Sequence, residues 1–182
     1  MPARNGPLPE DVRAAHKKKY RELRKQAYFT PFGIAGYPPP DKAAIDATPE
    51  EREAKYHQKW AEGGTISYLF AYNDLLLSED SNKTASDFVR DRIREIVNNP
   101  KTAELLCPND HPIGTKRICL DSGYYETFNR DNVSLVDVRS APIKEITPAG
   151  LQTSEDMFEL DSIIFATGFD AMTGAVLEMD VS

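Results

Sequence analysis

The chain has 182 residues, of which 40% are hydrophobic and 28% charged, and its formal net charge at pH 7 is -7. Such a chain can bury a core as one domain or two small ones, and its acidic balance argues against a general nucleic-acid binder, which needs a basic face. No apolar run approaches the roughly 20 residues that span a bilayer, and the N-terminal residues lack the apolar core of a signal peptide. We therefore expect a cytoplasmic protein without integral membrane contact.

The first predicted element is a helix over residues 9–29. It begins with a proline and two acids, and its apolar side chains recur at three and four residues. Its outer face carries the lysine run 17–19 and further basic residues. Such a face is ordinarily solvated, and the alternative is that it binds an anionic partner. The proline- and glycine-rich residues 30–41 cannot continue the helix and are expected to form a loop.

Further helical segments follow before residue 100. Thr48 and Glu51 form a capping box ahead of a helix that the paired glycines 63 and 64 end, and its Tyr56 and Trp60 are expected to anchor the core. Residues 66–77 are apolar on nearly all sides and are therefore expected to be buried. Residues 84–97 carry a helical apolar stripe, and a short turn is expected over 100–106.

The period of the apolar residues changes after residue 106. Short apolar or alternating runs predict strands over 116–120, 133–137, 142–146 and 158–168, with a brief aromatic helix or turn over 123–132. We therefore expect an α/β protein with a helical subdomain at 1–106 and a strand-rich part at 107–182. The two cysteines are expected to be free thiols, and their spacing from His111 lacks the pattern of a zinc site, so no metal is predicted.

The apolar string Ile163–Ala166 is typical of a central strand that is covered on both faces. It leads into Thr167 and Gly168, and α/β sheets bind ligands just outside the carboxyl ends of such strands. Small residues there allow a cofactor to approach the backbone closely, although Gly168 can equally serve a turn alone.

Lys116 and Arg117 stand side by side at the start of a predicted strand. Neighbours on a strand point to opposite faces, so the two cations are expected to serve different partners. A lysine suits a phosphate group, and an arginine is a permanently charged fork for an anion that must stay ionised. The alternative is a solvated strand end, paired with acids such as Asp121 or Glu126.

Three stretches carry a family resemblance: HPIGTKRICLDSGYYETFNRDNVSLVD, APIKEITPAGL and ELDSIIFATGFDAMTGA. They resemble the Baeyer-Villiger monooxygenases, flavin enzymes that insert oxygen beside a ketone, and the first half of the chain is similar to the same family. The resemblance implies the middle segment of such an enzyme: a helical insertion, the back of the NADPH domain and the strand that returns to the FAD domain. The implied fold is a partial Rossmann-like three-layer dinucleotide-binding fold with an N-terminal helical insertion.

The resemblance also implies roles for particular residues. Lys116, with Thr115 beside it, would contact the 2'-phosphate of NADPH. Arg117 would be the catalytic residue, lying near the flavin and nicotinamide, where a guanidinium stabilises the peroxide anion that reduced flavin and oxygen form. Ala166, Thr167 and Gly168 would border a cofactor where the chain passes between the two nucleotide domains.

The sequence lacks other parts of the family pattern. No two of its ten glycines stand at i and i+2, so neither G-x-G-x-x-G fingerprint for FAD or NADPH is present. The family signature F-x-G-x-x-x-H-T-x-x-W-P is missing as well. The chain is therefore expected to be a fragment of an FAD- and NADPH-dependent enzyme, inactive alone and dependent on the remaining segments. The alternative is a non-catalytic remnant that binds a nucleotide or a partner protein.

Overall fold

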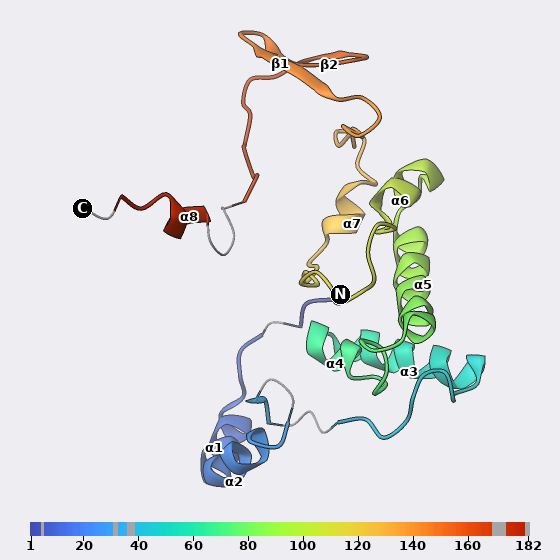
Figure 1. Ribbon diagram of the computed structural model, residues 1–182, viewed down its shortest axis with the longest axis vertical. Coiled ribbons are helices and arrows are strands. Elements are labelled where there is room, and N and C mark those ends of the chain that lie inside the picture. Colours follow the sequence, from blue (N-terminus) through green and yellow to red (C-terminus); the bar gives the residue numbers. More distant parts are fainter. Residues whose placement is uncertain (5, 31–32, 36–38, 169–173, 181–182) are drawn as a thin grey trace. The chain divides into compact units, whose positions relative to one another are not determined.

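The computed structural model describes residues 1–4, 6–30, 33–35, 39–168 and 174–180. Two compact units make up the chain, residues 1–135 and residues 136–182 (Figure 1), and each is described below by itself. The first unit includes residues 107–135, which pack against its helices. The domain boundary expected after residue 106 marks the change of apolar period, and as a division into domains it stays a prediction.

The first predicted helix is two helices, α1 (Glu10–Lys18) and α2 (Tyr20–Ala27). Lys19 separates them with φ -98° and ψ 7°, so the prediction of one continuous helix is wrong at this residue. No residue of either helix is buried. Most helical stability in proteins comes from packing an apolar face, and here no such packing enforces continuity through the break.

Helix α3 (Pro49–Glu62) has the predicted ends. The backbone N–H of Glu51 donates to the Thr48 hydroxyl at 3.2 Å, and the backbone N–H of Thr48 donates to the Glu51 carboxylate at 2.9 Å, which completes the capping box. The helix ends at Gly63, whose φ of 73° favours glycine. The short helix α4 (Thr65–Leu69) follows at once.

Helix α5 (Glu79–Ile96) begins five residues before the predicted stripe, because the Ser78 hydroxyl caps it by accepting the N–H of Ser81. Residues 100–106 form a helix, α6 (Pro100–Leu106), where only a turn was expected. Asn99 caps α6, and Arg94 of α5 grips Glu104 through two hydrogen bonds of 2.6 and 3.1 Å. This fork ties the two helices together at the surface.

The main core of the first unit lies between α3, α4 and α5. Tyr56, Tyr68, Leu75 and Phe88 are buried in it, so Tyr56 is confirmed as a core anchor, and Trp60 packs against its edge. The expected burial of residues 66–77 holds for Tyr68 and Leu75 but is wrong for Leu77, which is 87% exposed. A second apolar cluster joins α5 to α6 and consists of Ile93, Val97, Ala103 and Cys107.

Residues 107–135 follow the helices without forming the predicted strands. Neither 116–120 nor 133–137 is a strand, and the expected helix over the aromatic residues is confirmed as α7 (Tyr124–Thr127). One parallel bridge joins Pro2 to Asp121, where the Asp121 N–H donates to the Met1 carbonyl at 2.6 Å. Among the described residues the run 116–120 has no partner for a ladder along its length.

The second unit contains an antiparallel meander, β1 (Ile143–Thr147), β2 (Gly150–Thr153) and β3 (Met157–Glu159), in the order β1-β2-β3. The predicted strand over 142–146 is thereby confirmed. Gly150 has φ 149°, and a Cβ there would lie 1.9 Å from the Phe158 carbonyl oxygen, so only glycine fits. Helix α8 (Gly174–Leu177) is described beyond the sheet.

The prediction of a buried central strand at 158–168 is wrong in the described structure. Only its start belongs to a strand, β3, and residues 163–168 have none. Ile164 is 90% exposed and Phe165 69% exposed. A strand is buried on both faces only when neighbouring strands and helices cover it, and the described residues of this unit supply none there. No helix among the described residues is both long and apolar enough to cross a membrane.

Candidate functional site

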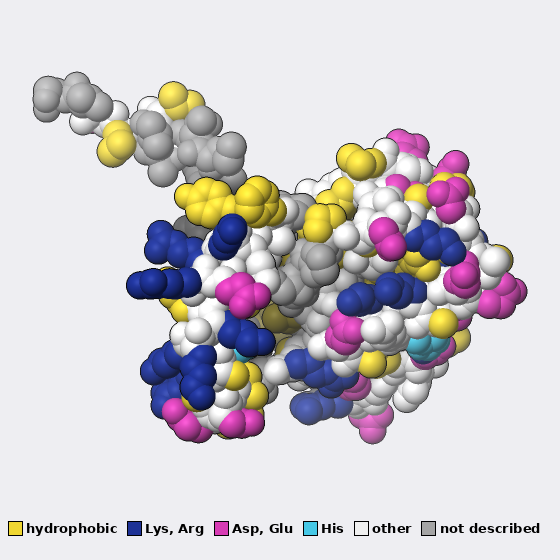
Figure 2. All heavy atoms as spheres, turned by 90° about the horizontal axis from the view of Figure 1, so that it is seen from below, with side chains coloured by type: hydrophobic (Ala, Val, Ile, Leu, Met, Phe, Trp, Pro, Cys, Tyr) yellow, Lys and Arg dark blue, Asp and Glu magenta, His cyan; other side chains and the backbone are white. Residues whose placement is uncertain are grey.

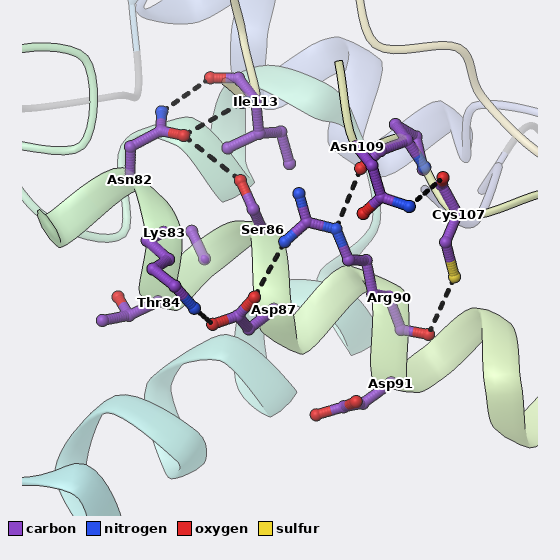
Figure 3. A network of polar contacts seen from close by, with 12 residues as sticks. Asn82, Lys83, Thr84, Ser86, Asp87, Arg90, Asp91, Cys107, Asn109 and Ile113 are labelled. Carbon is purple, nitrogen blue, oxygen red and sulfur yellow. Dashed lines mark hydrogen bonds and ion pairs between the residues drawn. The ribbon is translucent and has the colours of Figure 1, made fainter. Parts of the chain in front are cut away.

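The candidate site is the segment of residues 107–119, which leads from α6 to Lys116 and Arg117. Its first residues are tied to α5. Arg90 donates from Nε to the Pro108 carbonyl at 2.9 Å, and its guanidinium also pairs with Asp87 at 2.8 Å (Figure 3). The Cys107 thiol is buried, 3.8 Å from the Arg90 carbonyl oxygen, and burial raises the pKa of this thiol. Both cysteines are free.

The middle of the segment is held by Asn82 of α5. The side-chain amide of Asn82 donates to the Ile113 carbonyl at 2.8 Å and accepts the Ile113 N–H at 3.0 Å (Figure 3). Ile113 in turn packs its side chain against the main core. The backbone just before the two cations is therefore fixed by hydrogen bonds and by packing.

A tight turn follows at Pro112–Thr115. The Thr115 hydroxyl donates to the Pro112 carbonyl at 2.7 Å. Gly114 has φ 91°, and a Cβ on it would lie 2.7 Å from a methyl carbon of Leu76. The turn thus needs glycine both for its backbone angle and for its close approach to the Leu76 side chain. Thr115, predicted to bind a cofactor, is exposed beside Lys116.

Lys116 is exposed, with 66% of its side-chain surface open to solvent. Its Nζ lies 3.9 Å from one carboxylate oxygen of Asp110, which is the outer limit of an ion pair. The alternative partners expected from sequence, Asp121 and Glu126, form no ion pair with it. Asp121 instead caps the turn before α7 by accepting the N–H groups of Gly123 and Tyr124. A weak surface ion pair leaves the lysine charge available to an anion.

Arg117 is exposed as well, and among the described residues none forms an ion pair or hydrogen bond with its side chain. The next residue, Ile118, is half-buried and packs against the main core. Arg117 therefore has a fixed backbone and an unpaired guanidinium. This combination fits a charge held ready for a ligand better than a strand end that is neutralised locally.

Lys116 and Arg117 line one cavity of about 230 Å³ in the first unit. Arg90, His111 and Tyr125 line it too, together with Val89 of α5 and Met1. Of the three lysine and arginine residues that line the cavity, Arg90 is already paired with Asp87, so Lys116 and Arg117 offer their charges to an anionic group. Among the described residues no group of three or more His, Cys, Asp or Glu side chains is placed to hold a metal ion.

The predicted cofactor residues fall into two groups. Thr115, Lys116 and Arg117 lie together in the first unit, whereas Ala166, Thr167 and Gly168 belong to the second unit and are exposed there. Asn82 and Arg90 were not predicted as site residues. The one signal for Asn82 is a polar residue on the buried face of an amphipathic helix, where it is only 6% exposed.

Solved structures resemble the described fold over nearly its whole length. The OTEMO complex with FAD and NADP (form 4) matches with a TM-score of 0.92 and 39% identity, over 99% of this chain and 34% of that one. Oxidized steroid monooxygenase bound to NADP matches with a TM-score of 0.88 and 45% identity, over 97% of this chain and 33% of that one. The fold is thus that of a segment of the flavin monooxygenases, whose structures are Rossmann-like.

Curated relatives agree with this. A 2-oxo-Delta(3)-4,5,5-trimethylcyclopentenylacetyl-CoA monooxygenase of Pseudomonas putida is 39% identical over 99% of the chain, and a Baeyer-Villiger monooxygenase of Pseudooceanicola batsensis is 38% identical over all of it. No protein-family model matches the chain. The chain belongs to the Baeyer-Villiger monooxygenase family. It spans about a third of the curated relatives it matches, 33% of each of these two.

Proposed function

We propose that the chain is a segment of an FAD- and NADPH-dependent Baeyer-Villiger monooxygenase, which acts on a ketone together with the remaining segments of the enzyme. The observation that carries the proposal is the pair Lys116 and Arg117, held on a fixed backbone with both charges open to a ligand. The identity to monooxygenases over the whole chain supports the assignment.

Lys116 would hold the 2'-phosphate of NADPH, with Thr115 beside it. The fit rests on charge: an ammonium group that is 66% exposed and pairs with Asp110 only at 3.9 Å can bind a phosphate at little cost. A phosphate dianion attracts this ammonium more strongly than a single carboxylate does. The lysine would therefore favour NADPH over NADH, which lacks that phosphate.

Arg117 would stabilise negative charge beside the flavin. When bound, FAD would supply the redox chemistry by which NADPH and O₂ convert the ketone into an ester, with water as the second product. Arg117 has no described partner to give up when a ligand binds. A charge placed in advance at the point where an anion develops contributes on the order of 3 to 4 kcal/mol to transition-state stabilisation.

The other nucleotide contacts would come from segments beyond this chain. With no G-x-G-x-x-G fingerprint, the chain itself cannot place a pyrophosphate at the usual helix N-terminus. We infer a three-layer Rossmann-like fold for the complete enzyme, in which Ala166, Thr167 and Gly168 border a cofactor. The exposed apolar side chains of Ile164 and Phe165 support this inference, because they need a cover.

A hybrid enzyme tests the proposal. The chain replaces the corresponding third of the Pseudomonas putida relative, and ketone-dependent NADPH oxidation and ester formation are measured with that relative's own substrate. Lys116→Ala is expected to raise the KM for NADPH at least tenfold and to leave that for NADH unchanged. Arg117→Ala is expected to lower ester formation by about 100-fold or more with flavin still bound.

Two results would count against the proposal. If Lys116→Ala changes the KM for NADPH and the KM for NADH equally, Lys116 does not contact the 2'-phosphate. If Arg117→Ala forms ester at the full rate, Arg117 has no catalytic role. Arg139→Ala in the second unit serves as the matched control, since it removes an exposed arginine outside the candidate site.

One observation favours the second candidate, a binding module. Helices α1 and α2 have no buried residue, and Tyr28 and Phe29 just after them are 84% and 78% exposed. Basic side chains gather over these helices (Figure 2), namely Arg13, Lys17, Lys18, Lys19, Arg21, Arg24 and Lys25. Two results together would favour the module: the hybrid enzyme is inactive and binds no flavin, and the isolated chain binds a defined acidic partner through this face.

A further inference from the structure

We propose that Asn82 of α5 is the positioning residue of the candidate site: its side-chain amide sets the backbone from which Lys116 and Arg117 project. This inference rests on the proposed function for those two cations. Asn82 itself touches neither of them and acts through Ile113.

Every hydrogen-bonding position of the Asn82 amide is occupied. Its nitrogen donates to the carbonyl oxygens of Leu75 and Ile113, both at 2.8 Å. Its oxygen accepts the Ile113 N–H at 3.0 Å and the Ser86 hydroxyl at 3.2 Å. A primary amide has two donors and two acceptor positions, so this one is fully used in a place that is only 6% exposed. Apart from the longer glutamine, no other side chain carries such an amide.

The two bonds to Ile113 are the ones that position the site. They hold the N–H and the C=O of a single residue, as a strand partner would, and so fix both peptide planes that flank it. Lys116 follows three residues later, across the turn that Thr115 closes onto Pro112. Because hydrogen bonds from Thr115 to the Pro112 carbonyl close this turn, the direction in which Lys116 and Arg117 leave the core depends on how Ile113 is held.

The same face of α5 holds the start of the segment. Asn82, Ser86 and Arg90 are spaced four residues apart and therefore lie on one side of the helix (Figure 3). Arg90 binds the Pro108 carbonyl, and Asn82 binds Ile113. The residues between these two anchors include Asp110, the ion-pair partner of Lys116. Helix α5 thus positions the backbone that carries both Lys116 and its ion-pair partner Asp110.

Trypsin provides a direct readout on the full chain, since it cleaves after Lys116 and Arg117 only when the local backbone opens. Mass spectrometry follows these cuts and, in the same sample, the cuts after Lys17 and Lys18 in α1. Asn82→Ala is expected to accelerate cleavage at 116 and 117 about tenfold without changing cleavage in α1. Asn82→Asp keeps the side-chain size and the bond from the Ile113 N–H, and should act in the same direction.

Two controls separate positioning from general destabilisation. Ser86→Ala removes only the outer bond to Asn82, and Ile93→Val removes one buried methylene from the same helix, so both should leave cleavage at 116 and 117 within about twofold. Equal acceleration at all sites in the Asn82 variants, no acceleration, or an equal effect of Ile93→Val would each overturn the proposal.

The hybrid enzyme separates this inference from the proposed function. If Asn82 acts through the position of Lys116, Asn82→Ala raises the KM for NADPH about tenfold in the parent but less than twofold when Lys116→Ala is already present. If Asn82→Ala raises the KM for NADPH equally with and without Lys116→Ala, the positioning role is overturned. A Lys116→Ala variant that does not alter the KM at all counts against the proposed function, and the trypsin result then decides the positioning role by itself.

Discussion

Asp110 lies between a histidine and a lysine: one of its carboxylate oxygens is 2.5 Å from His111 Nδ1, and the other is 3.9 Å from Lys116 Nζ. The carboxylate therefore binds the imidazole closely and Lys116 only at the limit of an ion pair. The negative charge of Asp110 partly offsets the charge of Lys116, so a phosphate ligand competes with this carboxylate for the lysine.

Replacing Asp110 with Asn tests this relationship. The substitution keeps the shape of the side chain and removes its charge, so Lys116 gains attraction for a phosphate. Exposed ion pairs contribute up to about 1 kcal/mol, which corresponds to NADPH binding up to about fivefold tighter in the hybrid enzyme, with NADH binding unchanged. Weaker binding of NADPH would show that Asp110 supports the site instead of competing with the ligand.

Gly114→Ala is expected to destabilise the first unit. At φ 91° an added Cβ is strained, and it would also lie 2.7 Å from a methyl carbon of Leu76, so we expect a loss of about 2 kcal/mol in the free energy of unfolding. Urea denaturation measures this loss. Gly123→Ala is the control, since its φ of 101° brings strain with open space around the Cβ, and it should cost about 1 kcal/mol. Equal losses for the two variants would contradict the contact with Leu76.

Stability is expected to fall at alkaline pH because of the tyrosines in the main core. Burial raises the pKa of Tyr56 to about 12 from a value of 10.0, and burial raises the pKa of Tyr68 as well. Between pH 10 and about pH 12 the unfolded chain loses the Tyr56 proton and the folded chain keeps it. The stabilisation present below pH 10 is therefore lost as the pH rises towards 12. For Tyr56 the loss is about 2 to 3 kcal/mol.

Urea denaturation at pH 9 and pH 11.5 checks this dependence. Tyr56→Phe keeps the ring packing and removes the titrating hydroxyl, together with its 2.7 Å hydrogen bond to Thr84. The variant should be less stable at pH 9 and should lose less stability on going to pH 11.5. A pH dependence equal to that of the parent chain would place the titrating group elsewhere.

Phe165→Ser is expected to reduce self-association of the chain. Ile164 and Phe165 are adjacent, 90% and 69% exposed, and lie in a segment that has no strand partner among the described residues. Such a segment tends to pair with another copy. Sedimentation velocity at increasing concentration measures the effect. Leu77→Ser, at an 87% exposed site in the other unit, should change little, and an equal effect would point to general surface hydrophobicity.

Local signals predicted the helical half well. The capping box of Thr48 and Glu51, the stop at Gly63 and the core role of Tyr56 depend on neighbouring residues and on side-chain size, and the structure has all three. The break at Lys19 was missed because periodicity reports apolar spacing, whereas a helix with no buried face has nothing to hold it straight. The strand predicted over 158–168 does not form at residues 163–168 for a related reason: a strand requires a partner, which a local pattern cannot supply.

The family, the helix caps and the adjacency of Lys116 and Arg117 can be read from the order of the residues, because each is a property of residues close together in the chain. How those cations are held depends on contacts between distant parts of the chain. Asn82 meets Ile113 and Arg90 meets Pro108 through the folding of α5 against the segment that follows α6. Hydrogen bonds between residues 31 and 18 positions apart leave no periodic trace in a sequence, since each depends on where folding places the two partners.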